Sequence, residues 1–250
     1  MKINNPENFK FLPDAVLLDT DNTLYEYEPA HKNAIQALKK KFIQTFFISA
    51  KDFDRTYNQA RNEVHSNLLG KGSSHSRLLY IKRMLELLGL GSQVLMALDF
   101  EQAYWRTFLS NATLFDESRD FLDDLRLHKI PICIVTDLTA QLQFRKMVYF
   151  GLENHFDFIV TSEESGHDKP HNASFNLALE KMNAIGKRVW MIGDSLDNDI
   201  AGAKNAINAI TIQKIHSGVK KEGKISITDA EFNRYKDLRA LIKKISKNAR

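Results

Sequence analysis

Four short segments of the chain place carboxylates, a hydroxyl and a lysine where they could form one site. The segments are residues 19–23, 135–137, 169–170 and 193–199, and each lies at or shortly after the end of an apolar run of strand length. The carboxyl ends of strands in an open parallel sheet line the crevice where ligands bind. We therefore expect the four segments to converge on one spot.

The carboxylates of these segments suit a hard divalent cation. Asp19 and Asp21 stand two residues apart after the first apolar run, and Asp194 follows a later one. An Asp-x-Asp pair alone is common in turns, but its place at a strand end, with Thr23 behind it, favours a site. Mg²⁺ takes oxygen ligands and leaves positions for water and phosphate oxygens. We expect Asp19, Asp21 and Asp194 to hold Mg²⁺.

The same groups could transfer a phosphoryl group. An aspartate can attack phosphorus and form an aspartyl-phosphate, provided that the negative charge is neutralised. The cation would supply part of this and Lys169 the rest, while the hydroxyl of Thr136 completes the cradle. Asp21 would protonate the leaving alkoxide and later deprotonate the attacking water.

With these motifs in order along the chain, the sequence resembles the haloacid dehalogenase superfamily. The most specific piece is the stretch of residues 192–203, which carries Gly193, Asp194 and Asp199. The resemblance implies a nucleophile and metal ligand at Asp19, and an acid/base at Asp21 whose backbone carbonyl also meets the metal.

The resemblance assigns the remaining motif residues as well. It implies phosphoryl binding by Thr136 and Lys169, metal ligation by Asp194 and support of the metal site by Asp199. Asp137 stands where the family often has Asn; we group it with the phosphate-binding residues, although its added negative charge leaves its role open. Asp197 is expected to cap the helix that follows rather than to bind metal.

The elements that must position these residues are short apolar strands alternating with amphipathic helices. Strand-length runs lie at residues 15–18, 130–135, 156–160, 188–192 and 209–212, with helical patterns at 120–127, 174–182 and 197–206. Alternation of this kind predicts right-handed βαβ units on a parallel sheet. The expected fold class is α/β, a Rossmann-like doubly wound core.

A long interval without strand patterns follows the first motif. Helical spacing instead occupies residues 33–46, 53–69, 77–88 and 97–108. We predict a catalytic core from residues 1–24 and 112–250, with residues 25–111 as an inserted helical domain that resembles the superfamily's type 1 cap. Lys71, His75 and Arg77 are its candidate substrate contacts, with a solvated loop as the alternative.

Composition narrows the class of protein. The net charge is +4, and the basic residues 243–247 have no aromatic residues among them, which favours a solvated helix end over a nucleic-acid surface. The single cysteine, Cys133, lies in an apolar run and excludes an intrachain disulfide framework. The eight histidines show no zinc spacing. With no signal-peptide or membrane-spanning pattern, we expect a cytoplasmic monomer or homodimer that binds neither membrane nor nucleic acid.

Two classes of function fit these residues. The first is a Mg²⁺-dependent phosphatase acting on a small phosphomonoester, such as a sugar phosphate or nucleotide, through an aspartyl-phosphate. A phosphomutase on the same core is its enzymatic alternative. The second class is a non-catalytic binding protein built on the same scaffold. No reacting group of the motifs is missing, and this favours the phosphatase.

Overall fold

The chain divides into two compact units. The computed structural model describes residues 1–217, 219 and 227–248. One unit joins Met1–Glu26 to Thr113–Arg250, and the other is Tyr27–Ala112. The first is called the sheet unit and the second the helical unit.

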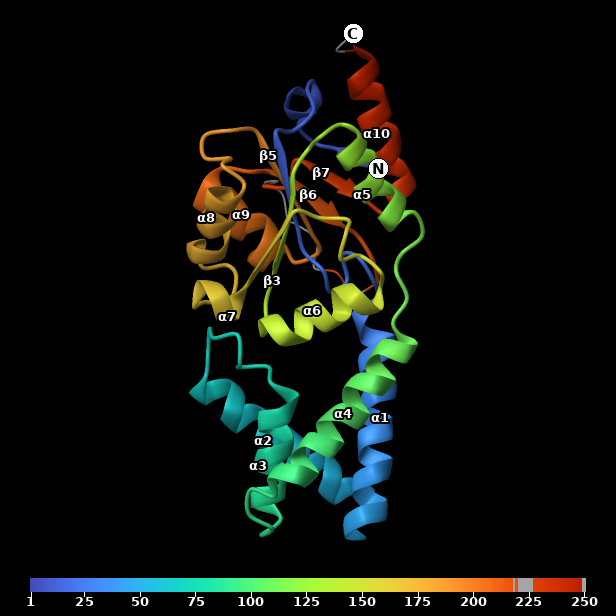
Figure 1. The fold of residues 1–250 in the computed structure, drawn as a ribbon, viewed down its shortest axis with the longest axis vertical. Coiled ribbons are helices and arrows are strands. Elements are labelled where there is room, and N and C mark those ends of the chain that lie inside the picture. Colours follow the sequence, from blue (N-terminus) through green and yellow to red (C-terminus); the bar gives the residue numbers. More distant parts are fainter. Residues whose placement is uncertain (218, 220–226, 249–250) are drawn as a thin grey trace. The chain divides into compact units, whose positions relative to one another are not determined.

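A seven-stranded sheet forms the centre of the sheet unit (Figure 1). The strands, in chain order, are β1 (Lys2–Ile3), β2 (Ala15–Leu18), β3 (Ile132–Thr136), β4 (Phe158–Thr161), β5 (Val189–Gly193), β6 (Ile210–Lys214) and β7 (Ala230–Phe232). Their spatial order is β1-β7-β6-β5-β2-β3-β4, and every pair is parallel except β1 with β7. The predicted parallel α/β core is therefore confirmed.

The two central pairings explain why the strand ends align. Leu18 at the end of β2 lies opposite Ile134 of β3 and Ile192 of β5. Residues of β2, β3 and β5 are buried throughout, as expected for strands covered on both faces. Strand β3 begins two residues later than the predicted run because Pro131 has no N–H to donate to a ladder.

Helices cover the two faces of the sheet. The helices of this unit are α5 (Ser118–Leu127), α6 (Ala140–Tyr149), α7 (Ser162–Ser165), α8 (Asn172–Lys181), α9 (Gly202–Ile207) and α10 (Tyr235–Asn248), with helical turns η1 (Pro6–Phe9) and η2 (Leu196–Ala201). Phe175 and Ala178 of α8 and Ala203 of α9 share one core cluster with Leu17 and Cys133. Helices α5 and α10 lie on the other side of the sheet, where their rings of Phe121 and Tyr235 meet (Figure 1).

Four helices form the helical unit, and each overlaps a stretch with predicted helical periodicity, although α1 begins six residues before its predicted start at residue 33. They are α1 (Tyr27–Phe46), α2 (Ala50–Asn67), α3 (Arg77–Leu87) and α4 (Val94–Asn111). Phe42, Phe53 and Phe100 are fully buried between α1, α2 and α4. Ser49 and Ser76 cap α2 and α3, because their hydroxyls accept backbone N–H groups of the first turns.

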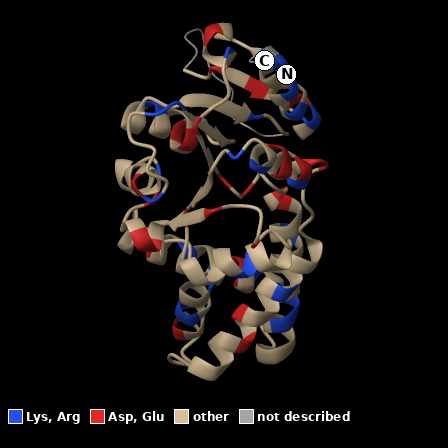
Figure 2. Ribbon diagram, turned by 45° about the horizontal axis from the view of Figure 1, so that its top comes forward, with Lys and Arg blue, Asp and Glu red and all other residues tan. Residues whose placement is uncertain are grey.

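Acidic and basic residues are mixed along the helices of both units (Figure 2). Among the described residues, none of the helices combines the length and the apolar character that crossing a bilayer requires.

Candidate active site

Three neighbouring strands bring the predicted site residues to one edge of the sheet. Asp19 follows β2 directly, Thr136 is the last residue of β3, and Asp194 follows β5 directly. Strand β2 pairs with β3 on one side and with β5 on the other. The carboxyl ends of these strands therefore hold one cluster of polar groups, as parallel pairing demands.

Three carboxylates of this cluster are close enough to share a cation. Asp19, Asp194 and Asp199 each offer an oxygen, and these oxygens lie within 4.8 Å of one another. Asp19 and Asp199 are buried and Asp194 is partly exposed, so the group is open to solvent on one side. A set of carboxylate oxygens with an open side fits a hard divalent cation such as Mg²⁺.

The pKa shifts of the three carboxylates also favour a bound cation. Burial raises the pKa of Asp19 above its ordinary value, and Lys169 offsets this only in part. Burial and the neighbouring charge of Asp19 raise the pKa of Asp194 to about 6. Burial likewise raises the pKa of Asp199 to about 8, against the attraction of Lys169. A second cation beside Lys169 would relieve this repulsion and favour the ionised carboxylates.

Lys169 bridges the nucleophile candidate and the second acidic loop. Its Nζ lies 2.7 Å from Oδ1 of Asp19, 2.7 Å from Oδ1 of Asp199 and 2.9 Å from the carbonyl oxygen of Val135. Burial would lower the pKa of Lys169, but the two carboxylates hold it well above its ordinary value. The amine is therefore a fixed cation at the centre of the site.

Asp137 contacts the chain around Lys169 through its side chain. Its Oδ1 accepts hydrogen bonds from the backbone N–H of Lys169, at 2.9 Å, and from the hydroxyl of Ser162, at 2.8 Å. The carboxylate of Asp137, whose role the sequence left open, thus accepts a hydrogen bond from a backbone amide. These contacts tie the end of β3 to the Lys169 loop.

Hydroxyl groups surround the two carboxylates of the first motif. Thr23 donates to Oδ2 of Asp19 at 3.0 Å, and this leaves the other oxygen for Lys169. The hydroxyls of Thr20 and Thr136 lie 2.8 Å apart, both buried. The hydroxyl of Thr136, at the end of β3, therefore meets the segment after β2 and can rotate between donor and acceptor roles.

Asp21 is directed to a different partner from the other acidic residues. Lys146 of α6 donates to its Oδ1 at 2.8 Å and to its Oδ2 at 3.2 Å, and the hydroxyl of Tyr25 also donates to Oδ1. Burial would raise the pKa of Asp21, but Lys146 and these hydrogen bonds outweigh it and hold the pKa below its ordinary value. Its side chain lies outside the three-carboxylate group found among the described residues.

The second acidic loop is built on a glycine and a serine. A Cβ at Gly193 would lie 2.4 Å from Oδ2 of Asp199, so only glycine leaves room for that carboxylate. Oδ2 of Asp199 also accepts the backbone N–H of Ser195 at 3.0 Å. The helix cap predicted at Asp197 is wrong, because the hydroxyl of Ser195 accepts the N–H of Asn198 at the start of η2.

Two residues of the site were outside the sequence prediction. Lys146 lies in α6, for which no helix was predicted, and its side chain is 1% exposed. His216 follows β6, and its Nε2 lies 3.1 Å from Oδ2 of Asp194. The scattered histidines offered no spacing signal, so only the fold brings His216 to the carboxylate.

The candidate contacts of the helical unit lie in two places. His75 and Arg77 line a pocket within this unit, together with residues of α1 and α2. Lys71 lies in the preceding turn and does not line that pocket.

Comparison with known proteins identifies the family of the chain. A family model described as haloacid dehalogenase-like hydrolase matches residues 13–206. The ribulose-1,5-bisphosphate 5-phosphatase of Halopiger xanaduensis is 35% identical over 199 residues, which cover 79% of this chain and 83% of that protein. The glyceraldehyde 3-phosphate phosphatase of Methanopyrus kandleri is 26% identical over 242 residues, covering 94% of this chain and 99% of the relative.

A solved structure shares the fold over nearly the whole chain. The HAD phosphatase from Thermococcus onnurineus superposes with a TM-score of 0.69 at 21% identity, covering 91% of this chain and 97% of the other. The family match spans the motifs around Asp19, Thr136, Lys169 and Asp194. The chain therefore belongs to the haloacid dehalogenase-like hydrolases, as a phosphatase-type member that hydrolyses phosphoric monoesters.

Proposed function

We propose that the protein is a Mg²⁺-dependent phosphatase that hydrolyses a small phosphorylated sugar through an aspartyl-phosphate on Asp19. The observation that carries the proposal is the position of Lys169, whose Nζ lies 2.7 Å from both Asp19 and Asp199 beside a third carboxylate, Asp194. The names of the two phosphatase relatives, which refer to phosphorylated sugars, support the substrate class.

Three carboxylates would hold the metal. Asp19, Asp194 and Asp199 would supply the oxygens. The resemblance to the superfamily implies the backbone carbonyl of Asp21 as a further ligand. Bound Mg²⁺ would screen the negative charge of the phosphoryl group and of the carboxylates around it.

Asp19 would act as the nucleophile. One of its oxygens accepts from Thr23 and the other from Lys169, so the carboxylate is fixed in orientation. Attack on phosphorus forms the new O–P bond as the bond to the leaving alkoxide breaks. Lys169 would stabilise the charge on the transferring oxygens, and the hydroxyl of Thr136 would donate to one of them.

Asp21 would move the protons of both half-reactions. It would give a proton to the leaving alkoxide in the first step and accept one from the attacking water in the second. Asp19 is the better placed of the two as nucleophile, since it belongs to the three-carboxylate group that could hold the metal and the side chain of Asp21 does not. Inorganic phosphate then leaves and Asp19 is regenerated.

The helical unit would serve as the cap of the enzyme. It is Tyr27–Ala112, inserted in the chain directly after the first motif. A cap that closes during turnover would exclude bulk water from the site and select the substrate.

The test is phosphate release from a panel of phosphomonoesters, with Mg²⁺ and with EDTA. The panel contains ribulose 1,5-bisphosphate, glyceraldehyde 3-phosphate, other sugar phosphates and nucleoside monophosphates. We expect Mg²⁺-dependent release that is highest on a sugar phosphate and is lost in Asp19→Asn. Asp116→Asn makes the same change at an exposed position and should behave as wild type.

Two outcomes would count against the proposal. Substantial release by Asp19→Asn would remove Asp19 as nucleophile. Transfer of the phosphoryl group between positions of a sugar, without release of phosphate, would favour the phosphomutase alternative.

A further inference from the structure

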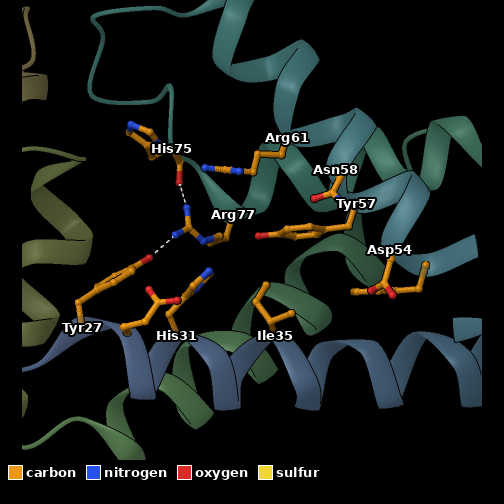
Figure 3. A pocket seen from close by; sticks show the side chains of 11 residues that line it. Tyr27, His31, Ile35, Asp54, Tyr57, Asn58, Arg61, His75 and Arg77 are labelled. Carbon is orange, nitrogen blue, oxygen red and sulfur yellow. Dashed lines mark hydrogen bonds between the residues drawn. The ribbon is translucent and has the colours of Figure 1, made fainter. Parts of the chain in front are cut away.

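The helical unit contains a pocket with a buried arginine at its wall. The pocket has a volume of about 540 Å³ and is lined by residues of α1, α2 and the start of α3 (Figure 3). Its lining residues are Tyr27, Glu28, His31, Ile35, Phe53, Asp54, Tyr57, Asn58, Arg61, His75 and Arg77. We call it the Arg77 pocket. All of these residues belong to one compact unit, so the pocket is a property of that unit alone.

Arg77 is a buried cation whose partners are neutral. Its side chain is held by the hydroxyl of Tyr27 and the carbonyl oxygen of His75, each at 2.5 Å. Its guanidinium lies 5.5 Å from the ring of Tyr80 and 5.4 Å from that of Tyr104. The residue is 8% exposed, and its Nε is buried without a hydrogen-bond acceptor.

No carboxylate of the described chain forms an ion pair with Arg77. Buried charges in proteins are normally paired with an opposite charge, because neutral hydrogen-bond partners and rings replace the lost hydration only in part. An arginine kept in this state, with its guanidinium directed toward a pocket, is therefore a candidate receptor for an anion from outside the chain. Arginine is well suited to this role because its planar fork binds phosphate and carboxylate oxygens in pairs.

A second arginine adds to the positive charge. Arg61 of α2 lines the same pocket as His75 and Arg77 (Figure 3). His31 is affected by both, since burial and then the charges of Arg77 and Arg61 lower its pKa to about 4. The pocket also has two carboxylates, Glu28 and Asp54. Asp54 is compensated by Lys39, whose Nζ lies 2.6 Å from its Oδ2.

We propose that the Arg77 pocket is an anion-binding site, which takes a phosphate or carboxylate group on Arg77 with Arg61 beside it. The anion could be a free phosphate or the non-reacting anionic end of the substrate. Only the second of these sources rests on the proposed phosphatase function. Binding itself does not depend on turnover, so it can be tested separately.

The first experiment measures binding of inorganic phosphate to the full chain by calorimetry in EDTA, where no metal helps the catalytic carboxylates. We expect saturable binding to wild type and at least about tenfold weaker binding to Arg77→Met. Arg83→Gln is the matched control, because Arg83 lies on the same helix but is paired with Glu63 and Glu86 outside the pocket. It should bind as wild type.

Arg77 is buried, so its replacement could unfold the helical unit. Circular dichroism would check this, and Arg61→Gln at an exposed position gives a second variant that should weaken phosphate binding severalfold without loss of fold. Absence of saturable binding to wild type would overturn the proposal. Equal affinity in wild type, Arg77→Met and Arg61→Gln would overturn it as well.

A second experiment identifies the source of the anion. The KM of Arg61→Gln is compared with wild type on a sugar bisphosphate and on a sugar monophosphate. A rise in KM confined to the bisphosphate would place the substrate's second phosphate in the pocket. Unchanged KM on both substrates, in a variant that binds inorganic phosphate more weakly, would identify free phosphate as the occupant.

Discussion

Lys146 donates from its Nζ to both carboxylate oxygens of Asp21, at 2.8 and 3.2 Å, although 125 residues separate them in the sequence. The lysine side chain is 1% exposed and that of Asp21 is 30% exposed. A buried cation therefore donates to both oxygens of a partly open carboxylate. The pair links α6 to the turn after β2 and fixes the group that we propose as the acid and base of the reaction.

Replacement of Lys146 by Met should lower kcat while KM changes little. The variant frees Asp21 and removes the charge that holds its pKa low. Because general acid–base catalysis contributes about 10²- to 10⁴-fold and the carboxylate itself remains, we expect a loss of about tenfold. Any limb of the pH–rate profile that reports Asp21 should move to higher pH.

Arg145→Met provides the control for this prediction. Arg145 is the preceding residue of α6 and is exposed, so its loss removes the same charge without touching Asp21. If Lys146→Met and Arg145→Met had the same kcat and the same pH profile, the Lys146–Asp21 pair would have no part in the reaction.

Mg²⁺ should stabilise the protein, and Asp194→Asn should remove most of that effect. A ligand that binds only the folded state adds about 2.7 kcal/mol at about 100 times its Kd. In EDTA the substitution should no longer lower the stability of the protein, because it takes away one of three carboxylates that repel one another. We therefore expect Asp194→Asn to melt at or above the wild-type temperature without metal and below it with metal.

Thermal unfolding with Mg²⁺ and with EDTA measures both effects. Asp197→Asn, three residues further along the same loop and outside the three-carboxylate group, is the control and should follow wild type. A metal-induced shift that survives in Asp194→Asn would mean that the cation binds elsewhere.

Gly193→Ala should disturb the site through Asp199. The added Cβ would lie 2.4 Å from Oδ2 of that carboxylate, which must then move away from Lys169 and Ser195. Overpacking of this kind costs about 1–3 kcal/mol of stability, and activity should fall with it. Urea unfolding of Gly193→Ala, Asp199→Ala and the double variant tests the cause. Simple additivity of the two changes would show that they act independently.

Asp229 should stabilise the edge of the sheet in a pH-dependent way. Its carboxylate is 1% exposed and accepts from Asn5, Asn8 and the backbone N–H of Thr211, with Lys204 nearby. Burial would raise the pKa of Asp229, but these donors hold it below its ordinary value of 3.8.

The sign of the pH dependence follows from the lowered pKa. The stabilisation is fully present above the unfolded-state pKa and is lost as pH falls through the lower folded-state value. Asp229→Asn should therefore be less stable than wild type by about 1–3 kcal/mol at neutral pH, with the gap closing below about pH 4. Urea unfolding across this range measures it, with Asp116→Asn as the exposed control. A gap that is constant with pH would contradict the assignment.

Sequence patterns predicted the parts of the fold that depend on local periodicity. The five apolar runs became β2 to β6, and the motif residues Asp19, Thr136, Lys169 and Asp194 meet because parallel strands end on the same side. Strands β1 and β7 were missed because two and three residues are too few for a period-2 pattern.

Sequence periodicity could not predict the contacts between segments that are distant along the chain. Helix α6 buries Gln143 and Lys146 beside Leu142 and Met147, so polar residues interrupt its apolar stripe. Nothing in the spacing of Lys146 or His216 indicates the carboxylates that they meet. In the helical unit, Arg77 was predicted as a substrate contact from the sequence. Arg61 was not, because its place in the pocket depends on how α2 packs against α3.

The most direct test of the account is whether a phosphoryl group forms on Asp19. The Asp21→Ala variant keeps the nucleophile but has no group to activate water, so the intermediate should accumulate. Para-nitrophenyl phosphate is the substrate, since its leaving group needs no proton. We expect a burst of nitrophenolate with Mg²⁺ and, after rapid quenching, a phosphorylated peptide that contains Asp19. A phosphoryl group on another residue, or turnover by Asp21→Ala with no phosphorylated protein, would contradict it.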